Sequence, residues 1–190
     1  MAENQVPDYA EGAGLLDETV LPPARPASMR VVVAGAGVVG RSIARELLAS
    51  GHLVTLVDKR QSVFDADPVD GADQHTGDAC ELSVLTHLEI EKADVVVAAT
   101  GDDKANLVVS LLAKTEFAVS RVVARVNEPR NEWLFDDRWG VDVAVSTPRL
   151  IVSMVEEAVS VGDVVRLMTL RRGGANIVSI TLPEQTPLAG

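Results

Sequence analysis

The feature that most constrains this chain is the order of elements within residues 29–58. A short apolar run predicts a buried strand, a glycine-rich loop follows it, and a helical pattern leads to a second apolar run that ends in an acid. These five segments are residues 29–34, 35–40, 42–49, 53–57 and Asp58. This order is typical of a dinucleotide-binding unit.

Each residue type in the loop has a physical role. Gly35 permits a tight turn off the strand, Gly37 lets a pyrophosphate approach the backbone, and Gly40 lets the helix pack close to the sheet. The free N–H groups of the helix start favour a phosphate. Arg41 falls in the first helical turn, where a cation opposes the helix dipole, so a nearby phosphate would suit it; a solvated arginine is the alternative.

Asp58 stands at about the distance from the glycines that such units require. Its carboxylate can accept hydrogen bonds from a ribose 2′-hydroxyl and repels a 2′-phosphate. The acid therefore favours NAD or an unmodified adenine nucleotide over NADP. A glycine-rich turn without a ligand is the alternative.

The rest of the chain alternates strand patterns with helical patterns. Strands are expected at residues 72–76, 94–99, 121–126 and 141–145, and helices at 62–66, 81–88, 104–115 and 127–138. This alternation predicts an α/β fold, a doubly wound, Rossmann-like, parallel six-stranded sheet in the order 3-2-1-4-5-6.

A long helix should follow from residue 147 to about 160, because Ser146, Thr147 and Pro148 form a typical helix start. Its apolar stripe is either core or a surface for another subunit. A hairpin of strands 164–170 and 176–182 cannot be a domain alone, so it would begin a small C-terminal α+β domain. The predicted units are a flexible extension, a nucleotide-binding domain, a linker or dimerisation helix and a partial C-terminal domain, at residues 1–28, 29–146, 147–161 and 162–190.

Composition narrows the partners. The net charge of −11 argues against nucleic acid and against docking on an anionic membrane. The single cysteine, Cys80, permits no internal disulfide, which fits a reducing cytoplasm. No apolar run is long enough to predict membrane insertion.

Other strand ends supply further candidates. Asp78 and Ala79 could receive an adenine edge or form an ordinary turn, and Arg125 could approach a ligand or pair with a carboxylate. Residues 100–103 could flank the phosphates or the distal ribose, or Asp102 and Asp103 could simply cap a helix.

No catalytic or metal-ligating set is predicted. The only tyrosine, Tyr9, lies in the extension, so a Tyr-x-x-x-Lys centre is excluded. The three histidines show no metal-ligand spacing. Cys80 fits a small buried thiol better than a nucleophile.

With these residues in view, residues 29–160 resemble the KTN domain, also called RCK, of bacterial potassium-transport regulators of the TrkA type. The similar stretches are residues 31–40, Asp58, 77–79, 93–100, 102–103, 106–107, 124–127 and 140–142. Lys104 departs from the pattern, because an acidic residue is common there, which argues against a metal-assisted triphosphate site.

The resemblance implies a cytoplasmic, non-enzymatic regulatory subunit that binds NAD(H), or ATP or ADP, and gates a membrane potassium channel or transporter. It implies dimers, assembled into rings at the inner face of the membrane. The implied nucleotide-binding residues are Gly35, Gly37, Val38, Val39, Gly40, Arg41, Asp58, Lys59, Asp78, Ala79, Thr100 and Arg125. Two alternatives remain, an NAD-dependent oxidoreductase with a site completed across a subunit interface and a structural Rossmann module without a nucleotide.

Overall fold

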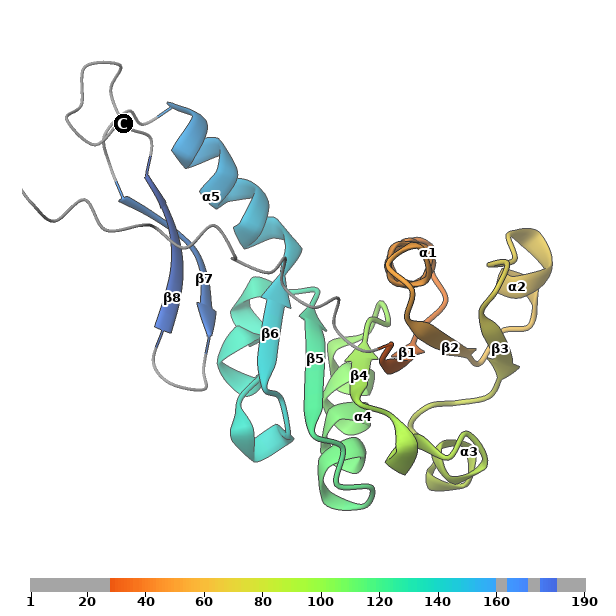
Figure 1. Cartoon of the computed structure of the whole chain (residues 1–190). Coiled ribbons are helices and arrows are strands. Elements are labelled where there is room, and N and C mark those ends of the chain that lie inside the picture. Colours follow the sequence, from red (N-terminus) through yellow and green to blue (C-terminus); the bar gives the residue numbers. More distant parts are fainter. Residues whose placement is uncertain (1–27, 160–163, 171–174, 181–190) are drawn as a thin grey trace, which may run out of the picture.

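A computed structural model describes residues 28–159, 164–170 and 175–180. One parallel sheet has the order β3-β2-β1-β4-β5-β6, so the predicted fold class and strand order are confirmed (Figure 1). Its strands are β1 (Arg30–Ala34), β2 (Leu53–Asp58), β3 (Asp73–Thr76), β4 (Val95–Ala98), β5 (Arg121–Val126) and β6 (Val143–Ser146).

Helices connect the strands and cover both faces of the sheet. The α-helices are α1 (Val38–Ala49), α2 (Ser62–Ala66), α3 (Leu82–His87), α4 (Asp103–Thr115) and α5 (Thr147–Val159). The 3₁₀ helices are η1 (Ile90–Lys92), η2 (Pro129–Leu134) and η3 (Asp137–Trp139). Helix α1 starts earlier than the expected residue 42, because Gly37 is its N-cap and Gly40 lies within its first turn.

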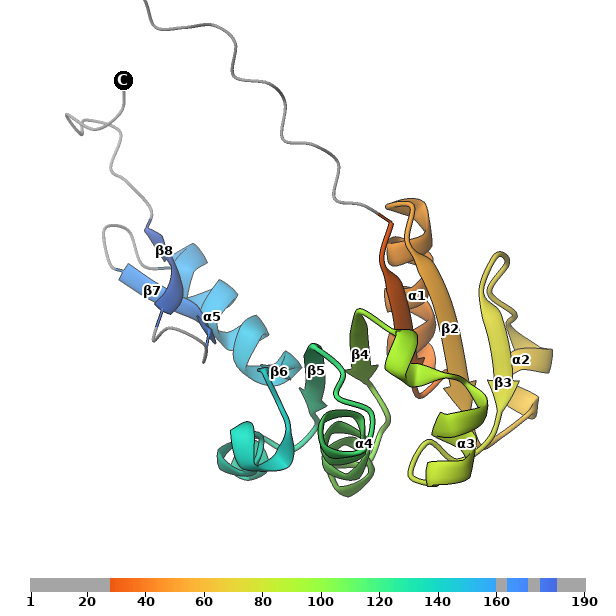
Figure 2. The same cartoon turned by 60° about the horizontal axis from the view of Figure 1, so that its bottom comes forward.

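Alternate residues of β1 serve two separate cores. Val31 and Val33 pack in the cluster that contains Phe64 of α2 and Ala44 of α1. Val32 and Ala34 pack in the larger cluster, which α3 and α4 close from the opposite face. Figures 1 and 2 show α1 and α2 on one side of the β1–β3 half and α3 on the other. The apolar runs therefore read as strands buried on both faces.

The expected helix over residues 127–138 is wrong, because the segment forms η2 and η3 instead. Between them Phe135 is fully buried in the larger core. The next residue, Asp136, is extended, and its side chain accepts a hydrogen bond from the Arg138 N–H at 3.0 Å. Burying Phe135 and capping a new turn interrupt the helix there.

Helix α5 extends away from the sheet after β6 (Figures 1 and 2). Of its predicted apolar stripe, Ile151, Met154, Val155 and Val159 are exposed and lie outside the core. The antiparallel pair β7 (Val164–Leu170) and β8 (Ala175–Ile180) follows. Residues 1–27, 160–163, 171–174 and 181–190 lie outside the described residues, so the four-unit division of the chain stays a prediction.

Candidate functional site

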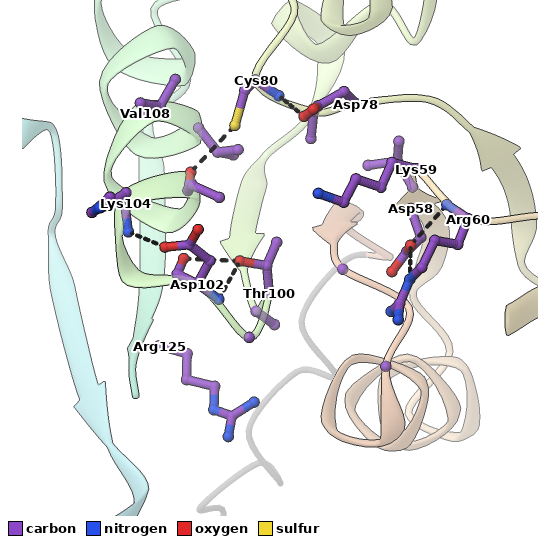
Figure 3. A pocket seen from close by; sticks show the side chains of 18 of the residues that line it. Asp58, Lys59, Arg60, Asp78, Cys80, Thr100, Asp102, Lys104, Val108 and Arg125 are labelled. Atoms are coloured by element: carbon purple, nitrogen blue, oxygen red, sulfur yellow. Dashed lines mark hydrogen bonds and ion pairs between the residues drawn. The ribbon is translucent and has the colours of Figure 1, made fainter. Parts of the chain in front are cut away.

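A cavity of about 790 Å³ opens at the carboxyl ends of the strands, where β1 lies between β2 and β4 (Figure 3). The strand order reverses there, and this crevice is the usual ligand site of an open α/β sheet. Ten of the predicted site residues line the cavity: Gly35, Gly37, Val38, Val39, Asp58, Lys59, Asp78, Ala79, Thr100 and Arg125. The two others, Gly40 and Arg41, do not line it.

Two loop glycines are required by packing. Gly35 has a φ of +103°, and a Cβ there would lie 2.8 Å from the backbone of Thr100. A Cβ on Gly40 would lie 1.8 Å from the Gly35 carbonyl oxygen. The predicted tight turn at Gly35 and close helix packing at Gly40 are therefore confirmed.

The glycine loop leads directly into the start of α1. Its N-cap, Gly37, has no side chain, and no side-chain cap bonds to the helix start. The first N–H groups of a helix lack partners within the helix. A Cβ on Gly37 would meet nothing within 4 Å, so open space lies above its backbone. This arrangement suits an anionic group at the helix N-terminus.

The Arg41 side chain does not line this cavity. Its Nε donates to the Asp67 carboxylate at 3.0 Å, and its Nη1 donates to the Ala36 carbonyl at 2.5 Å. Asp67 is also paired with Arg45 at 2.6 Å. The Arg41 side chain is only 13% exposed, so it is neither solvated nor directed at a phosphate in this structure.

Asp58 is a buried carboxylate at the end of β2. Its Oδ2 accepts the Ala36 N–H at 2.9 Å, and its Oδ1 accepts the Arg60 N–H at 3.0 Å and Arg60 Nε at 3.2 Å. Burial alone raises the pKa of Asp58, but the hydrogen bonds from Arg60 and Ala36 and the Arg60 charge outweigh it and hold this pKa below its usual range. The acid is therefore ionised at neutral pH and fixed to the glycine loop.

Thr100 and Asp102 form the opposite wall. The Thr100 N–H and hydroxyl both donate to Asn106 Oδ1, at 2.9 and 2.7 Å. Asp102 caps α4 by accepting the Lys104 N–H at 2.9 Å. The capping alternative for Asp102 is therefore correct, and its carboxylate also lines the cavity.

Asp103 has a role that the sequence did not indicate. This buried carboxylate accepts the Asn127 N–H at 2.7 Å, the Glu128 N–H at 3.1 Å and Asn131 Nδ2 at 2.9 Å. Asn127 Nδ2 donates in turn to the Thr100 carbonyl at 3.0 Å. Asp103 thus ties the start of α4 to the segment after β5 and supports the Thr100 wall.

Arg125 reaches the cavity from the end of β5, and Figure 3 shows its guanidinium pointing into the space. Its Nε is buried and has no hydrogen-bond partner among the residues that the structure describes. A buried donor without a partner carries an energetic cost. Because Nε is shielded from solvent, a ligand in the cavity would meet the terminal nitrogens of the guanidinium instead.

Asp78 and Cys80 lie at the turn after β3. Asp78 Oδ1 accepts the Cys80 N–H at 2.9 Å. Burial, with the neighbouring Asp78 charge, raises the pKa of the Cys80 thiol to about 11. The thiol is therefore protonated at neutral pH and unsuited to act as a nucleophile.

Arg60 and Lys104 also line the cavity, although neither was predicted as a ligand residue. With Lys59 and Arg125 they give four cationic side chains against three acidic ones in a chain of net charge −11. The basic pair that follows Asp58 in the sequence is the signal that could have identified Arg60. The balance makes this cavity locally favourable for an anion.

Two further properties concern only the described part of the chain. It holds no group of three or more histidine, cysteine, aspartate or glutamate residues placed to bind a metal ion. None of its helices has the length and apolar character to cross a membrane.

Comparison with known proteins identifies relatives of this arrangement. Residues 31–147 match the TrkA-N domain family. The chain is 63% identical over 162 residues to the Trk system potassium uptake protein TrkA of Mycobacterium tuberculosis, covering 85% of this chain and 74% of the relative.

Two solved structures have the same fold. The GsuK RCK domain is 25% identical with a TM-score of 0.56, and the match covers 64% of this chain and 26% of that chain. The GsuK channel bound to NAD is 18% identical with a TM-score of 0.62, and the match covers 78% of this chain and 26% of that chain.

Proposed function

This chain belongs to the TrkA-N domain family, and from that premise we propose that it is a nucleotide-sensing regulatory subunit of a potassium uptake system. It acts in the cytoplasm, at the inner face of the membrane, by binding a potassium channel or transporter. It carries out no reaction of its own. The main support for this proposal is the relative of 63% identity, which is a potassium uptake protein.

The cavity at the strand-order reversal carries the nucleotide part of the proposal. Its volume of about 790 Å³ is within the range of small-molecule sites. The start of α1 suits a phosphate, Asp58 suits a ribose diol, and the Arg125 guanidinium, which points into the cavity, suits a further anionic or carbonyl oxygen. NAD(H) places these groups in the matching order, and ADP or ATP is the second candidate. The NAD-bound GsuK channel is consistent with this assignment, but its likeness is one of fold.

We expect NADH, NAD, ADP and ATP, titrated separately into the full chain, to show at least one affinity in the micromolar range, about −8 kcal/mol. Isothermal titration calorimetry without any substrate measures this directly. The ranking would distinguish a sensor of redox state from a sensor of adenylate. Absence of heat with all four nucleotides would refute nucleotide sensing by this chain.

Regulation requires two conformations that bind the nucleotide with different affinities, because a ligand shifts an equilibrium only by that difference.

Helix α5 is the element that we assign to contact with a second copy. Its residues Ile151, Met154 and Val155 are 57%, 62% and 56% exposed, which is unusual for a cluster on one helix of a monomer.

Replacing Met154 by glutamate should therefore dissociate the proposed dimer, because an ionised side chain would be desolvated in an apolar interface. Sedimentation velocity should show a dimer for the wild-type chain and a monomer for the variant, with nucleotide binding retained. Leu53→Glu is the matched control, since Leu53 is 62% exposed at the opposite end of the sheet. A dimer that survives Met154→Glu but not Leu53→Glu would place the interface elsewhere.

The oxidoreductase alternative needs an acid–base group beside the nicotinamide. The residues that line the cavity include no histidine or tyrosine, which leaves lysine and aspartate as acid–base candidates, and the raised pKa of Cys80 makes its thiol a poor one. No observation favours this alternative over regulation.

A further inference from the structure

Arg60 lies where the proposed function requires a ribose to bind. Its Nε is 3.2 Å from Asp58 Oδ1, and its backbone N–H donates to the same oxygen at 3.0 Å. The other oxygen, Oδ2, accepts the Ala36 N–H at 2.9 Å. Figure 3 shows the Arg60 side chain beside Asp58 at the cavity wall.

The free positions on Asp58 determine what a ribose must displace. A carboxylate offers about four lone-pair sites, two on each oxygen. Both sites of Oδ1 are taken by Arg60, and one site of Oδ2 is taken by Ala36. A ribose diol that bonds to both oxygens must therefore displace Arg60 Nε. The two backbone bonds remain and keep the acid in place.

The displaced guanidinium stays close to the ribose. The Arg60 side chain is 59% exposed, so it can move without disturbing the core. Among the described residues, the only hydrogen-bond and ion-pair partner of its guanidinium is Asp58. Lys59, the next residue along the chain, lines the same cavity and adds a second cation. The charge of Asp58 is thus offset at the position of the ribose 2′-oxygen.

We propose that Arg60 determines specificity at the ribose, allowing this pocket to bind adenine dinucleotides that carry a 2′-phosphate, of the NADPH class, as well as those with a free diol. A lone acid at this strand end repels a 2′-phosphate, whereas a nearby arginine accommodates one. The planar fork of arginine matches phosphate oxygens in pairs. The inference rests on the proposed function, since it concerns the same pocket, and it reverses the preference that Asp58 alone implies.

The test is calorimetric titration of the full chain with NADH and with NADPH. We expect the wild-type chain to bind both with affinities within roughly tenfold of each other, and Arg60→Gln to weaken NADPH by roughly tenfold or more. NADH should bind Arg60→Gln more tightly, because its ribose no longer has to displace the guanidinium. Arg60→Lys keeps the charge without the fork, so its NADPH affinity should lie between the other two.

Arg130→Gln is the matched control. Arg130 donates its backbone N–H and Nη2 to the carboxylate of Glu128, two residues earlier, as Arg60 does to Asp58, but it does not line the cavity. Its substitution should leave both affinities at the wild-type values. Thermal unfolding of each variant confirms that the chain is folded before titration.

The outcomes separate this inference from the proposed function. NADH binding without NADPH binding in the wild-type chain would overturn the role of Arg60 and leave nucleotide sensing intact. Equal weakening of both nucleotides by Arg60→Gln would also overturn it, because the residue would then act through the fold or the general charge. Failure of the wild-type chain to bind either dinucleotide would overturn this inference, and the proposed function would fall with it only if ADP and ATP also failed to bind.

Discussion

Replacing Asp103 by alanine is expected to lower the free energy of unfolding by about 3 kcal/mol. The carboxylate accepts four hydrogen bonds, two from Asn127, one from Glu128 and one from Asn131. Alanine would leave these partly buried donors, including two backbone N–H groups, without their acceptor. Urea unfolding at pH 7, followed by circular dichroism, measures the loss.

The same carboxylate should make stability depend on pH. Burial alone raises the pKa of Asp103, but hydrogen bonds from Asn127, Asn131 and Glu128 outweigh it, and the net pKa lies below the usual range. An acid with a depressed folded pKa stabilises the fold above its unfolded pKa of about 3.9. That contribution is lost as the pH falls through the folded pKa. Asp103→Asn removes it, so the stability difference between wild type and Asp103→Asn should shrink below about pH 4.

Asp70 provides the control, because it is an exposed aspartate between α2 and β3. Asp70→Ala should change the free energy of unfolding by less than about 0.5 kcal/mol. A loss of similar size for Asp70→Ala and Asp103→Ala would show that the Asp103 bonds do not stabilise the fold. A difference between wild type and Asp103→Asn that stays constant with pH would show that the Asp103 pKa is not depressed.

Local sequence patterns were sufficient to predict the parallel sheet and its strand order. Apolar runs of strand length separated by helical patterns determine a parallel arrangement, because parallel strands need crossover connections. The glycine spacing located the first crossover, and β1 with its neighbours has the expected order. The roles assigned to Gly35 and Gly40 were a tight turn and close helix packing, and the contacts around their backbones agree with both roles.

Contacts between distant residues were the part that local patterns could not supply. Asp103 was interpreted as a possible cap, yet it bonds to groups 24 to 28 residues away. Arg41 was interpreted as facing either a phosphate or solvent, and the structure shows a third arrangement, a pair with Asp67, which is 26 residues away. Phe135 interrupts an expected helix because it is buried in a core built from many segments. In each case the partner is determined by the assembled fold, which a one-dimensional pattern does not contain.

The glycine loop separates folding from binding, because the same added methyl group should impair mainly folding at Gly40 and mainly nucleotide binding at Gly37. Gly40→Ala should destabilise the fold by about 3 kcal/mol or more, since its Cβ would lie 1.8 Å from the backbone oxygen of Gly35 and only a shift of α1 could relieve this. Gly37→Ala should cost less than about 1 kcal/mol, because its Cβ meets nothing within 4 Å and its φ of −65° suits any residue. Urea unfolding of both variants measures the two effects.

At Gly37 the added methyl group should weaken nucleotide binding and leave the fold nearly unchanged. A Cβ there occupies the space through which a pyrophosphate approaches the backbone, so Gly37→Ala should weaken NADH by roughly tenfold or more while the chain stays folded. Each variant is the control for the other, because each adds one methyl group within the same loop. A folded Gly37→Ala chain with wild-type NADH affinity would mean that the phosphates do not cross the start of α1. A stable Gly40→Ala chain would mean that α1 can move away from the sheet at little cost, and the close packing assigned to Gly40 would then not be required for the fold.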